Sequence, residues 1–306
     1  MLRPVESDVN RRQSPDWLGR PERGNLLSLR LIVWMALALG RPFARLFLYP
    51  ICLYFLVFSP FARSASRKYL HRALGRTAGL ADSFRHFHTF ASTILDRVFL
   101  LNGRFSALDV SVHGAEIMDQ IVAEGKGCVL LGAHIGSFEV IRAAGRLRGP
   151  RISMAMYEDN ARKVGAVLGE INPDLRMEVI ALGRVDSIFR IEAALERGDV
   201  VGMLADRTLQ SGGTIPCRFF GEDARFPTGP IRIARMLKRP VALMFGLYHG
   251  GNRYEIHIER FLDPAPAVAR ERGQEIENLV LRYAGRLEHY CRLAPYNWFN
   301  FYDFWR

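Results

Sequence analysis

The run GCVLLGAHIGSFE, residues 127–139, decides the architecture because an apolar segment ends here in a polar turn. Its first seven residues form a short apolar run that begins with glycine, which is typical of a strand buried on both faces. Ser137 is a natural N-cap, so we expect a helix over residues 137–147. His134 then lies on the turn between strand and helix, at the sheet edge where open α/β folds gather their active sites.

Strands and helices are predicted to alternate through the middle of the chain. The predicted strands cover residues 127–133, 151–157, 177–182 and 199–205, and the predicted helices between them cover residues 137–147, 159–170 and 185–197. Such alternation implies right-handed crossovers between parallel strands. The sequence therefore predicts an α/β fold with a central, largely parallel sheet flanked by helices.

Four further elements complete the predicted domain. Residues 240–248 and 253–261 are strand-like and are joined through His-Gly-Gly-Asn, which predicts a hairpin. Helices are predicted over residues 82–101 and 270–292, the first from apolar residues that recur at steps of three and four. We assign residues 63–306 to this domain.

The N-terminal region has a different composition. Residues 1–28 are polar and form a predicted arm, whereas residues 29–62 are strongly apolar but interrupted at Arg41, Pro42 and Arg45. The uninterrupted halves fall short of, or barely reach, the roughly 20 apolar residues that a membrane-spanning helix needs. We expect two membrane-associated helices that lie in one leaflet, with the arginines extending to the headgroups. A buried helical pair packed on the domain is the alternative.

The chain is basic, with 42 Lys and Arg against 31 Asp and Glu and a formal net charge of +11. A basic surface favours anionic partners. The arginines are scattered and no zinc-finger, helix-turn-helix or aromatic RNA-binding pattern occurs, so no nucleic-acid partner is expected. Five basic residues directly follow the apolar region and favour the anionic cytoplasmic face of a membrane: Arg63, Arg67, Lys68, Arg72 and Arg76. The four cysteines are far apart, which predicts reduced, buried thiols.

His134 and Glu139 are the candidate catalytic pair. Residues five apart on one continuous helix point about 140° away from each other, so His134 must precede the helix while Glu139 lies in its first turn. A carboxylate beside the imidazole can orient it and stabilise the imidazolium, which makes His134 a general base for a substrate hydroxyl. Ordinary capping and packing by the two residues is the alternative. No G-x-S-x-G, H-E-x-x-H or phosphate-loop pattern occurs, which argues against a serine hydrolase, a zinc protease and a nucleotide-driven ligase.

Five other residues are candidate substrate-binding positions. Asp206 and Arg207 follow a predicted strand and project over the same sheet edge, where Arg207 can bind an anionic headgroup or carrier phosphate and Asp206 can orient it. A buried structural brace explains this pair equally well. Thr228 and Gly229 open a predicted helix whose N–H groups can bind an anion or the oxyanion. Arg184 lies at another strand-to-helix junction and is a candidate for headgroup contact.

The His-x4-Glu spacing resembles the H-x4-D/E signature of the glycerolipid and lipid A acyltransferases. Other segments are similar to that family in the same order: LADRTLQSGG from Leu204, RFFG from Arg218, FPTGP from Phe226 and PYNWFNFYDFW from Pro295. Together they cover nearly the whole chain. The resemblance implies a glycerolipid acyltransferase-like domain that moves an acyl group from acyl carrier protein to a hydroxyl of a membrane lipid or glycolipid, without a cofactor. It also implies a location at the cytoplasmic face of the inner membrane.

Two departures bear on the substrate. Arg207 stands where the lipid A enzymes usually carry glutamine. The final residues, which include Asp303, replace the basic ending of those enzymes, and this ending is more similar to the aryl polyene branch of the family. The aromatic residues of this ending can line an acyl tunnel, lie at the membrane interface or close the core. A non-catalytic lipid-binding protein of the same fold and a lipid esterase remain as alternatives.

The remaining histidines predict no metal site. His86 and His88 are two residues apart on a helix, and His257 alternates within a strand. We therefore expect none of them to form a ligand cluster with acidic residues.

Overall fold

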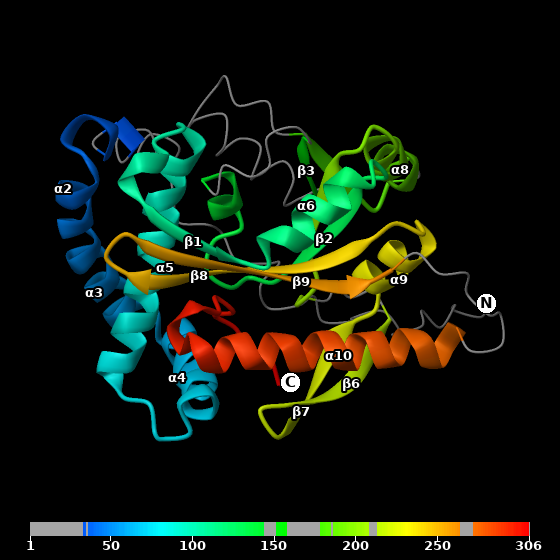
Figure 1. Cartoon of the computed structure of the whole chain (residues 1–306). Coiled ribbons are helices and arrows are strands. Elements are labelled where there is room, and N and C mark those ends of the chain that lie inside the picture. Colours follow the sequence, from blue (N-terminus) through cyan, green and yellow to red (C-terminus); the bar gives the residue numbers. More distant parts are fainter. Residues whose placement is uncertain are drawn as a thin grey trace, which may run out of the picture.

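The computed structural model describes residues 33–34, 36–143, 151–157, 178–184, 186–207, 213–263 and 272–305. They contain a seven-stranded sheet in the order β1-β9-β8-β2-β5-β3-β4 (Figure 1). Its strands are β1 (Asp109–His113), β2 (Cys128–Gly132), β3 (Ile152–Tyr157), β4 (Val179–Leu182), β5 (Val200–Leu204), β8 (Val241–Gly250) and β9 (Arg253–Leu262). All neighbouring strands are parallel except β8 and β9, which form the predicted hairpin. The predicted α/β fold with a largely parallel central sheet is confirmed.

Helices surround this sheet and extend along one end of it. They are α2 (Arg41–Leu46), α3 (Leu48–Phe58), α4 (Pro60–Leu74), α5 (Leu80–Leu101), α6 (Ala115–Ala123), α8 (Ser187–Glu196), α9 (Gly229–Met236) and α10 (Arg272–Leu293). In Figure 1, α6 lies above the sheet and the long α10 runs beneath it, while α2, α3 and α5 stand at the left end. The helices predicted over residues 82–101, 185–197 and 270–292 correspond to α5, α8 and α10.

The central strand β2 explains why the sheet needs cover on both faces. All five of its residues are buried, in the pattern that the apolar run predicted. Val129 and Leu131 belong to the hydrophobic core on the α10 side, whereas Cys128 and Leu130 belong to a second core beneath α6. Successive side chains of a strand point to opposite faces, so one apolar run serves both cores.

Several elements differ from the sequence-based expectation or were not expected, among them the helices α4 and α6. β1, at the far edge of the sheet, was not predicted, and neither was the separate hairpin of β6 (Thr214–Phe219) and β7 (Glu222–Pro227). In place of a helix from Ser137, the described chain has only a short 3-10 turn, η2 (Glu139–Arg142), whose N-cap is Phe138. The expected helix over residues 159–170 lies outside the described residues.

The short turn has a physical cause in the residues that precede it. Gly136 forms a β-bridge with Gly246 of β8, and the Ser137 N–H donates to the Gly246 carbonyl at 2.8 Å. The backbone of Gly136 and Ser137 is therefore held against β8 and is not free to begin a helix at Ser137. Ser137 donates its hydroxyl to the Glu139 carboxylate at 3.2 Å instead of capping a helix, so the predicted N-cap role of Ser137 is wrong.

The N-terminal helices turn where the sequence predicted a break. Gly40 has φ +83°, which glycine adopts readily, and it separates the helical residues before it from α2. α2 and α3 pack along α5, where Ala44 and Leu48 join Leu95 and Val98 in a third hydrophobic cluster. One side of the helical pair is thus covered by the domain.

Arg41 and Arg45 point toward the protein and not toward headgroups, contrary to the expectation. Arg41 is buried and forms an ion pair with Asp96 of α5 at 2.6 Å. Arg45 donates to the Tyr248 hydroxyl at 2.6 Å and to the Gly251 carbonyl at 2.8 Å. These arginines fasten the apolar helices to the domain because the β8–β9 turn offers acceptors beside them.

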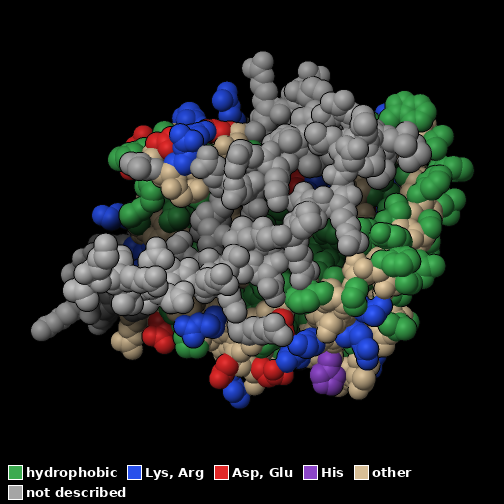
Figure 2. Space-filling model, turned by 180° about the vertical axis from the view of Figure 1, so that it is seen from behind, with side chains coloured by type: hydrophobic (Ala, Val, Ile, Leu, Met, Phe, Trp, Pro, Cys, Tyr) green, Lys and Arg blue, Asp and Glu red, His purple; other side chains and the backbone are tan. Residues whose placement is uncertain are grey.

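The outward side of α2 and α3 is an exposed apolar surface, here called the α3 surface. It consists of Phe43, Leu46, Phe47, Tyr49, Ile51, Leu53, Tyr54, Phe55, Val57 and Phe58, each more than a third exposed. In Figure 2, hydrophobic side chains form a continuous strip along the right-hand edge of the molecule. The stretch Arg41–Phe58 has a mean hydropathy of 1.4, is 17% buried, and is by length and composition apolar enough to cross a membrane. An exposed apolar patch of this extent is unusual for a soluble monomer.

Candidate active site

His134 lies just beyond the end of β2, on a turn that is locked on both sides. The His134 carbonyl accepts the Phe299 N–H at 2.7 Å, and the Gly136 N–H donates to the Asn297 carbonyl at 2.8 Å. Gly136 approaches Gly246 so closely that a Cβ on Gly136 would meet the Gly246 carbonyl oxygen at 1.8 Å. The backbone that carries the imidazole is therefore fixed by β8 and by residues 295–305 after α10, here called the C-terminal segment.

The His134 imidazole is hydrogen-bonded to Asp206. Nδ1 of His134 lies 2.8 Å from Oδ1 of Asp206, and the backbone N–H of His134 donates to Oδ2 at 3.1 Å. Asp206 follows β5, which is the parallel neighbour of β2, and Gly132 is paired in register with Leu204. The carboxyl ends of two adjacent parallel strands thus bring together residues that are 72 positions apart.

Asp206 is fully buried and is held by two further donors. Trp298 Nε1 donates to Oδ2 at 2.9 Å, and Asn300 Nδ2 donates to the same oxygen at 3.0 Å. Burial alone raises the pKa of this carboxyl, but the attraction and hydrogen bonds of His134 and the charge of Arg207 outweigh it. The pKa of Asp206 is therefore held well below its usual range, and the carboxyl is ionised at neutral pH.

The protonation state of His134 follows from this pair. Burial lowers the pKa of His134, and the Arg207 guanidinium lowers it further, against the opposing effect of Asp206. The imidazole is then neutral at neutral pH, and because an ionised carboxylate only accepts, Nδ1 carries the proton. Nε2 is left with a free lone pair. The side chain remains 28% exposed.

Glu139, the predicted partner of His134, has other contacts. Its Oε1 lies 2.8 Å from Arg97 Nε of α5, and Ser137 donates to its Oε2. No hydrogen bond joins Glu139 to His134 in the described residues. The direct carboxylate partner of the imidazole is Asp206, which the sequence had placed among the substrate-binding residues.

Arg207 is braced against the C-terminal segment. Its Nε donates to Asn300 Oδ1 at 2.6 Å and its Nη2 donates to the Phe299 carbonyl at 3.0 Å. Burial lowers its pKa, although Asp206 and Tyr302 act in the opposite direction. These contacts agree with the structural brace that the sequence left open, and a contact of Arg207 with an anionic headgroup stays a prediction.

The three remaining predicted site residues lie outside the hydrogen-bond network of His134 and Asp206. Arg184 follows the edge strand β4 and pairs with Asp186 at 3.3 Å, with both side chains half exposed. Thr228 does occupy the N-cap position of α9, but its hydroxyl donates to the Gly213 carbonyl at 3.0 Å. Gly229 is the first residue of that helix. Their substrate-binding roles stay predictions.

The C-terminal segment supplies site residues that the sequence analysis did not single out for this role. Trp298 and Asn300 hold Asp206, and the Asn297 side chain bonds both the N–H and the carbonyl of Tyr248, at 2.7 and 3.0 Å. Trp298 is wholly buried among Tyr69, Phe219 and Phe304, so this tryptophan closes the core. The two asparagines within a run of aromatic residues are the signal that could have indicated buried polar contacts, and it was not used.

One expectation about the histidines is wrong. His113, Glu255 and His257 offer ligand atoms that all lie within 4.8 Å of one another, and the two imidazoles stack with ring centroids 4.8 Å apart. The cluster arises because β1 pairs in parallel with β9 and places His113 directly beside His257. It could not be found while β1 was unrecognised.

Two comparisons with known proteins bear on this site. The family model of the bacterial lipid A biosynthesis acyltransferases matches residues 23–306, a span that contains His134, Glu139, Asp206 and the C-terminal segment. No curated protein matches the chain significantly.

Proposed function

Because this chain belongs to the bacterial lipid A biosynthesis acyltransferase family, and is thus an acyltransferase of the lipid A type, we propose that it uses His134 as a general base to acylate a lipid hydroxyl. The proposed donor is a fatty acyl thioester of acyl carrier protein. The proposed acceptor is a hydroxyl of a lipid or glycolipid. The observation that carries the proposal is the buried, ionised Asp206 held 2.8 Å from His134 Nδ1.

In the proposed reaction, Nε2 of His134 removes the proton of the acceptor hydroxyl as its oxygen attacks the thioester carbonyl. Asp206 stabilises the imidazolium that forms, in the manner of a catalytic triad aspartate. The tetrahedral intermediate then collapses, the C–S bond breaks, and the imidazolium returns its proton to the carrier thiolate. The products are the lipid ester and the free carrier thiol, and His134 is again neutral.

Glu139 retains a proposed role that is indirect. Glu139 forms an ion pair with Arg97, and the positive charge of Arg97 lowers the pKa of His134. Neutralising part of that charge would keep the imidazole basic enough to accept a proton. In this proposal Asp206 orients the base and Glu139 adjusts its electrostatic surroundings.

We further propose that the protein works at the cytoplasmic face of the inner membrane. The exposed α3 surface supports membrane contact, and the basic residues of α4 that follow it favour an anionic leaflet. The proposed division of the chain is a polar arm over residues 1–28, membrane-associated helices over residues 29–62 and the acyltransferase domain over residues 63–306. An acidic carrier protein would suit the net charge of +11.

The experiment is an acyl-transfer assay with purified protein, acyl carrier protein loaded with a labelled acyl chain, and a hydroxyl-bearing lipid. His134→Ala should reduce transfer by about 10²- to 10⁴-fold, the usual contribution of a general base. His249→Ala is the matched control. The His249 side chain is similarly exposed, and it pairs with Glu255 at 3.2 Å, outside the hydrogen-bond network of His134 and Asp206. Acyl transfer by the His134→Ala protein at the wild-type rate would contradict the mechanism.

The same assay separates the alternative functions. Release of free fatty acid without lipid ester would identify an esterase, and absence of turnover with every donor would favour a non-catalytic lipid-binding protein. Mass spectrometry of membrane lipids from cells with and without the protein identifies the acyl chain and acceptor together. An aryl chain on the missing lipid would support the aryl polyene branch.

A further inference from the structure

A cavity of about 560 Å³ lies on the outer side of α4, and its described lining residues include neither His134 nor Asp206. Two neighbouring rows of α4, spaced four residues apart, form one wall, and Thr77 and Ala78 of the following turn form the other. The lining residues from α4 are Pro60, Arg63, Ser64, Arg67, Lys68, His71 and Arg72. None of the described lining residues is acidic, so this wall of the cavity has the charge of an anion site.

Four cationic side chains line the cavity, and two of them, Arg63 and Arg67, have no carboxylate partner among the described residues. Lys68 pairs with Asp303 at 2.7 Å, and Arg72 pairs with Glu222 at 2.5 Å. By contrast, Arg63 donates to main-chain carbonyls at the end of α3, and Arg67 donates through Nε to the Ala78 carbonyl at 3.1 Å. Among the described residues neither has an acidic partner. The cavity thus carries an excess of two guanidinium charges.

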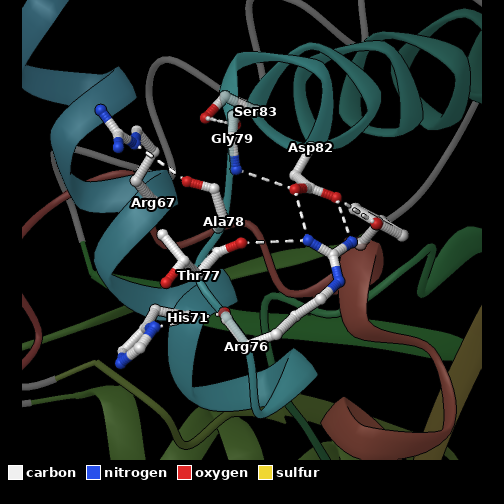
Figure 3. A network of polar contacts seen from close by, with 9 residues as sticks. Arg67, His71, Arg76, Thr77, Ala78, Gly79, Asp82 and Ser83 are labelled. Atoms are coloured by element: carbon white, nitrogen blue, oxygen red, sulfur yellow. Dashed lines mark hydrogen bonds and ion pairs between the residues drawn. The ribbon is translucent and has the colours of Figure 1, made fainter.

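The wall opposite α4 is held in place by its own polar network (Figure 3). Arg76 forms a bidentate ion pair with Asp82, at 2.8 and 2.9 Å, and Asp82 also accepts the Gly79 N–H at 2.8 Å. The turn that contributes Thr77 and Ala78 is therefore fixed before any ligand arrives. A wall that is fixed in advance reduces the ordering cost of binding an anion.

The position of the cavity indicates where its anion comes from. α4 begins at Pro60, two residues after the α3 surface ends at Phe58, and Arg63 bonds the last carbonyls of α3. Lys and Arg side chains gather in Figure 2 at the lower end of the hydrophobic strip. Apolar helices beside basic residues are the arrangement of interfacial membrane proteins, in which the cations meet lipid headgroups.

We propose that this cavity binds the phosphate of an anionic phospholipid headgroup while the α3 surface contacts the acyl chains. Guanidinium groups suit this ligand because they donate two parallel hydrogen bonds to phosphate oxygens. The inference rests on the proposed membrane contact of the α3 surface, but it is independent of the catalytic role of His134. The cavity fixes how the protein sits on the membrane rather than what it acylates.

The test measures binding of the full chain, kept soluble in detergent, to lipid nanodiscs of phosphatidylcholine with and without one quarter phosphatidylglycerol. The double variant Arg63→Gln/Arg67→Gln should lose roughly tenfold or more of its affinity for the anionic nanodiscs. Its affinity for neutral nanodiscs should fall much less, because the choline of phosphatidylcholine offsets the charge of its phosphate. The matched control Arg218→Gln/Arg225→Gln removes the same charge from the exposed β6–β7 hairpin and should lose much less.

Each outcome separates the headgroup site from its alternatives. An equal loss in the control variant would mean that bulk charge, not the cavity, attracts the membrane, and an unchanged preference for anionic lipid in the cavity variant would overturn the proposal directly. Displacement by millimolar inorganic phosphate alone would assign the site to free phosphate. Loss of acyl carrier protein binding with lipid binding intact would assign it to the carrier.

Failure of wild type to bind neutral nanodiscs counts against membrane contact by the α3 surface, and not against the cavity. If the double variant unfolds by circular dichroism, Arg67→Gln alone repeats the test.

Discussion

Arg41 and Asp96 form a two-point ion pair between α2 and α5, with Nε 2.6 Å from Oδ1 and Nη2 2.9 Å from Oδ2. Asp96 is fully buried and also accepts the Tyr254 hydroxyl of β9 at 2.9 Å. The pair thus joins an apolar N-terminal helix, the long α5 and the sheet at one point. Exposed apolar helices need such a polar attachment because their outward side contributes nothing to packing on the domain.

We predict that Arg41→Met lowers the free energy of unfolding by about 3–5 kcal/mol. Removing one partner leaves the charge of Asp96 buried and uncompensated, which is costlier than the loss of the pair itself. Denaturant unfolding in detergent micelles measures the change. The double variant Arg41→Met/Asp96→Asn should recover part of the loss because no buried charge remains. Arg184→Met, which breaks an exposed pair, is the control and should cost less than about 1 kcal/mol.

The sequence predicted the sheet well because its signals are local. The apolar run before His134 identified β2, and alternation with helical segments identified its parallel neighbours. β1 was missed because the predicted strands of the parallel sheet were identified from continuous apolar runs, and Asp109–His113 has none; its alternation of valine with polar residues is a strand signal that was not used. The burial of Arg41 was missed for a different reason: its partner lies 55 positions away, so only the packing of α2 on α5 reveals it.

The contacts within the candidate site were harder still to predict, because they join residues that are far apart in the sequence. His134 was found from its place at a strand end, but its carboxylate partner was sought five residues away along the chain. The actual neighbour, Asp206, comes from the adjacent parallel strand, a relationship fixed by sheet order and not by sequence spacing. Trp298 and Asn300 reach it from the far C-terminus, and no periodicity predicts such a contact.

We predict that Asp206→Asn reduces kcat more than Glu139→Gln does. An asparagine cannot hold the imidazole in the tautomer that leaves Nε2 free, nor stabilise the imidazolium, so a loss of about 10²- to 10⁴-fold is expected. Glu139→Gln keeps the shape of a residue that contacts Arg97 and Ser137, and its effect should be smaller. Steady-state rates with the same carrier thioester and acceptor measure both. The reverse order would restore Glu139 as the direct partner of His134.

The pH dependence of kcat/KM should report the lowered pKa of His134. The neutral imidazole is the active form, so activity is constant above the pKa and falls as the pH falls through it, with a midpoint below the ordinary value of 6.5. Arg207→Gln removes a positive charge that disfavours the imidazolium, so the midpoint should move to higher pH. Arg184→Gln should leave the profile unchanged. A wild-type midpoint above 6.5, or no shift in the Arg207 variant, would contradict this assignment.

The approach of Gly136 to Gly246 should make Gly136→Ala harmful to both fold and activity. Its φ of +56° strains any residue with a Cβ, and that Cβ would overlap the Gly246 carbonyl oxygen, so we expect a loss of about 2–4 kcal/mol in the free energy of unfolding. Gly103→Ala is the matched control, because Gly103 has φ +68° but open space around its Cβ position; it should cost about 1–2 kcal/mol. Thermal unfolding compares the two.

Gly136→Ala also tests whether acyl transfer depends on the position of His134, apart from the stability of the fold. Relief of the overlap must push the turn away from β8 and stretch the bond from the Gly136 N–H to the Asn297 carbonyl, which moves His134 relative to an Asp206 that Trp298 and Asn300 hold in place. At a temperature where both variants are folded, Gly136→Ala should therefore lose acyl transfer while Gly103→Ala keeps it. Equal activity of the two variants there would show that the position of His134 tolerates movement of its turn.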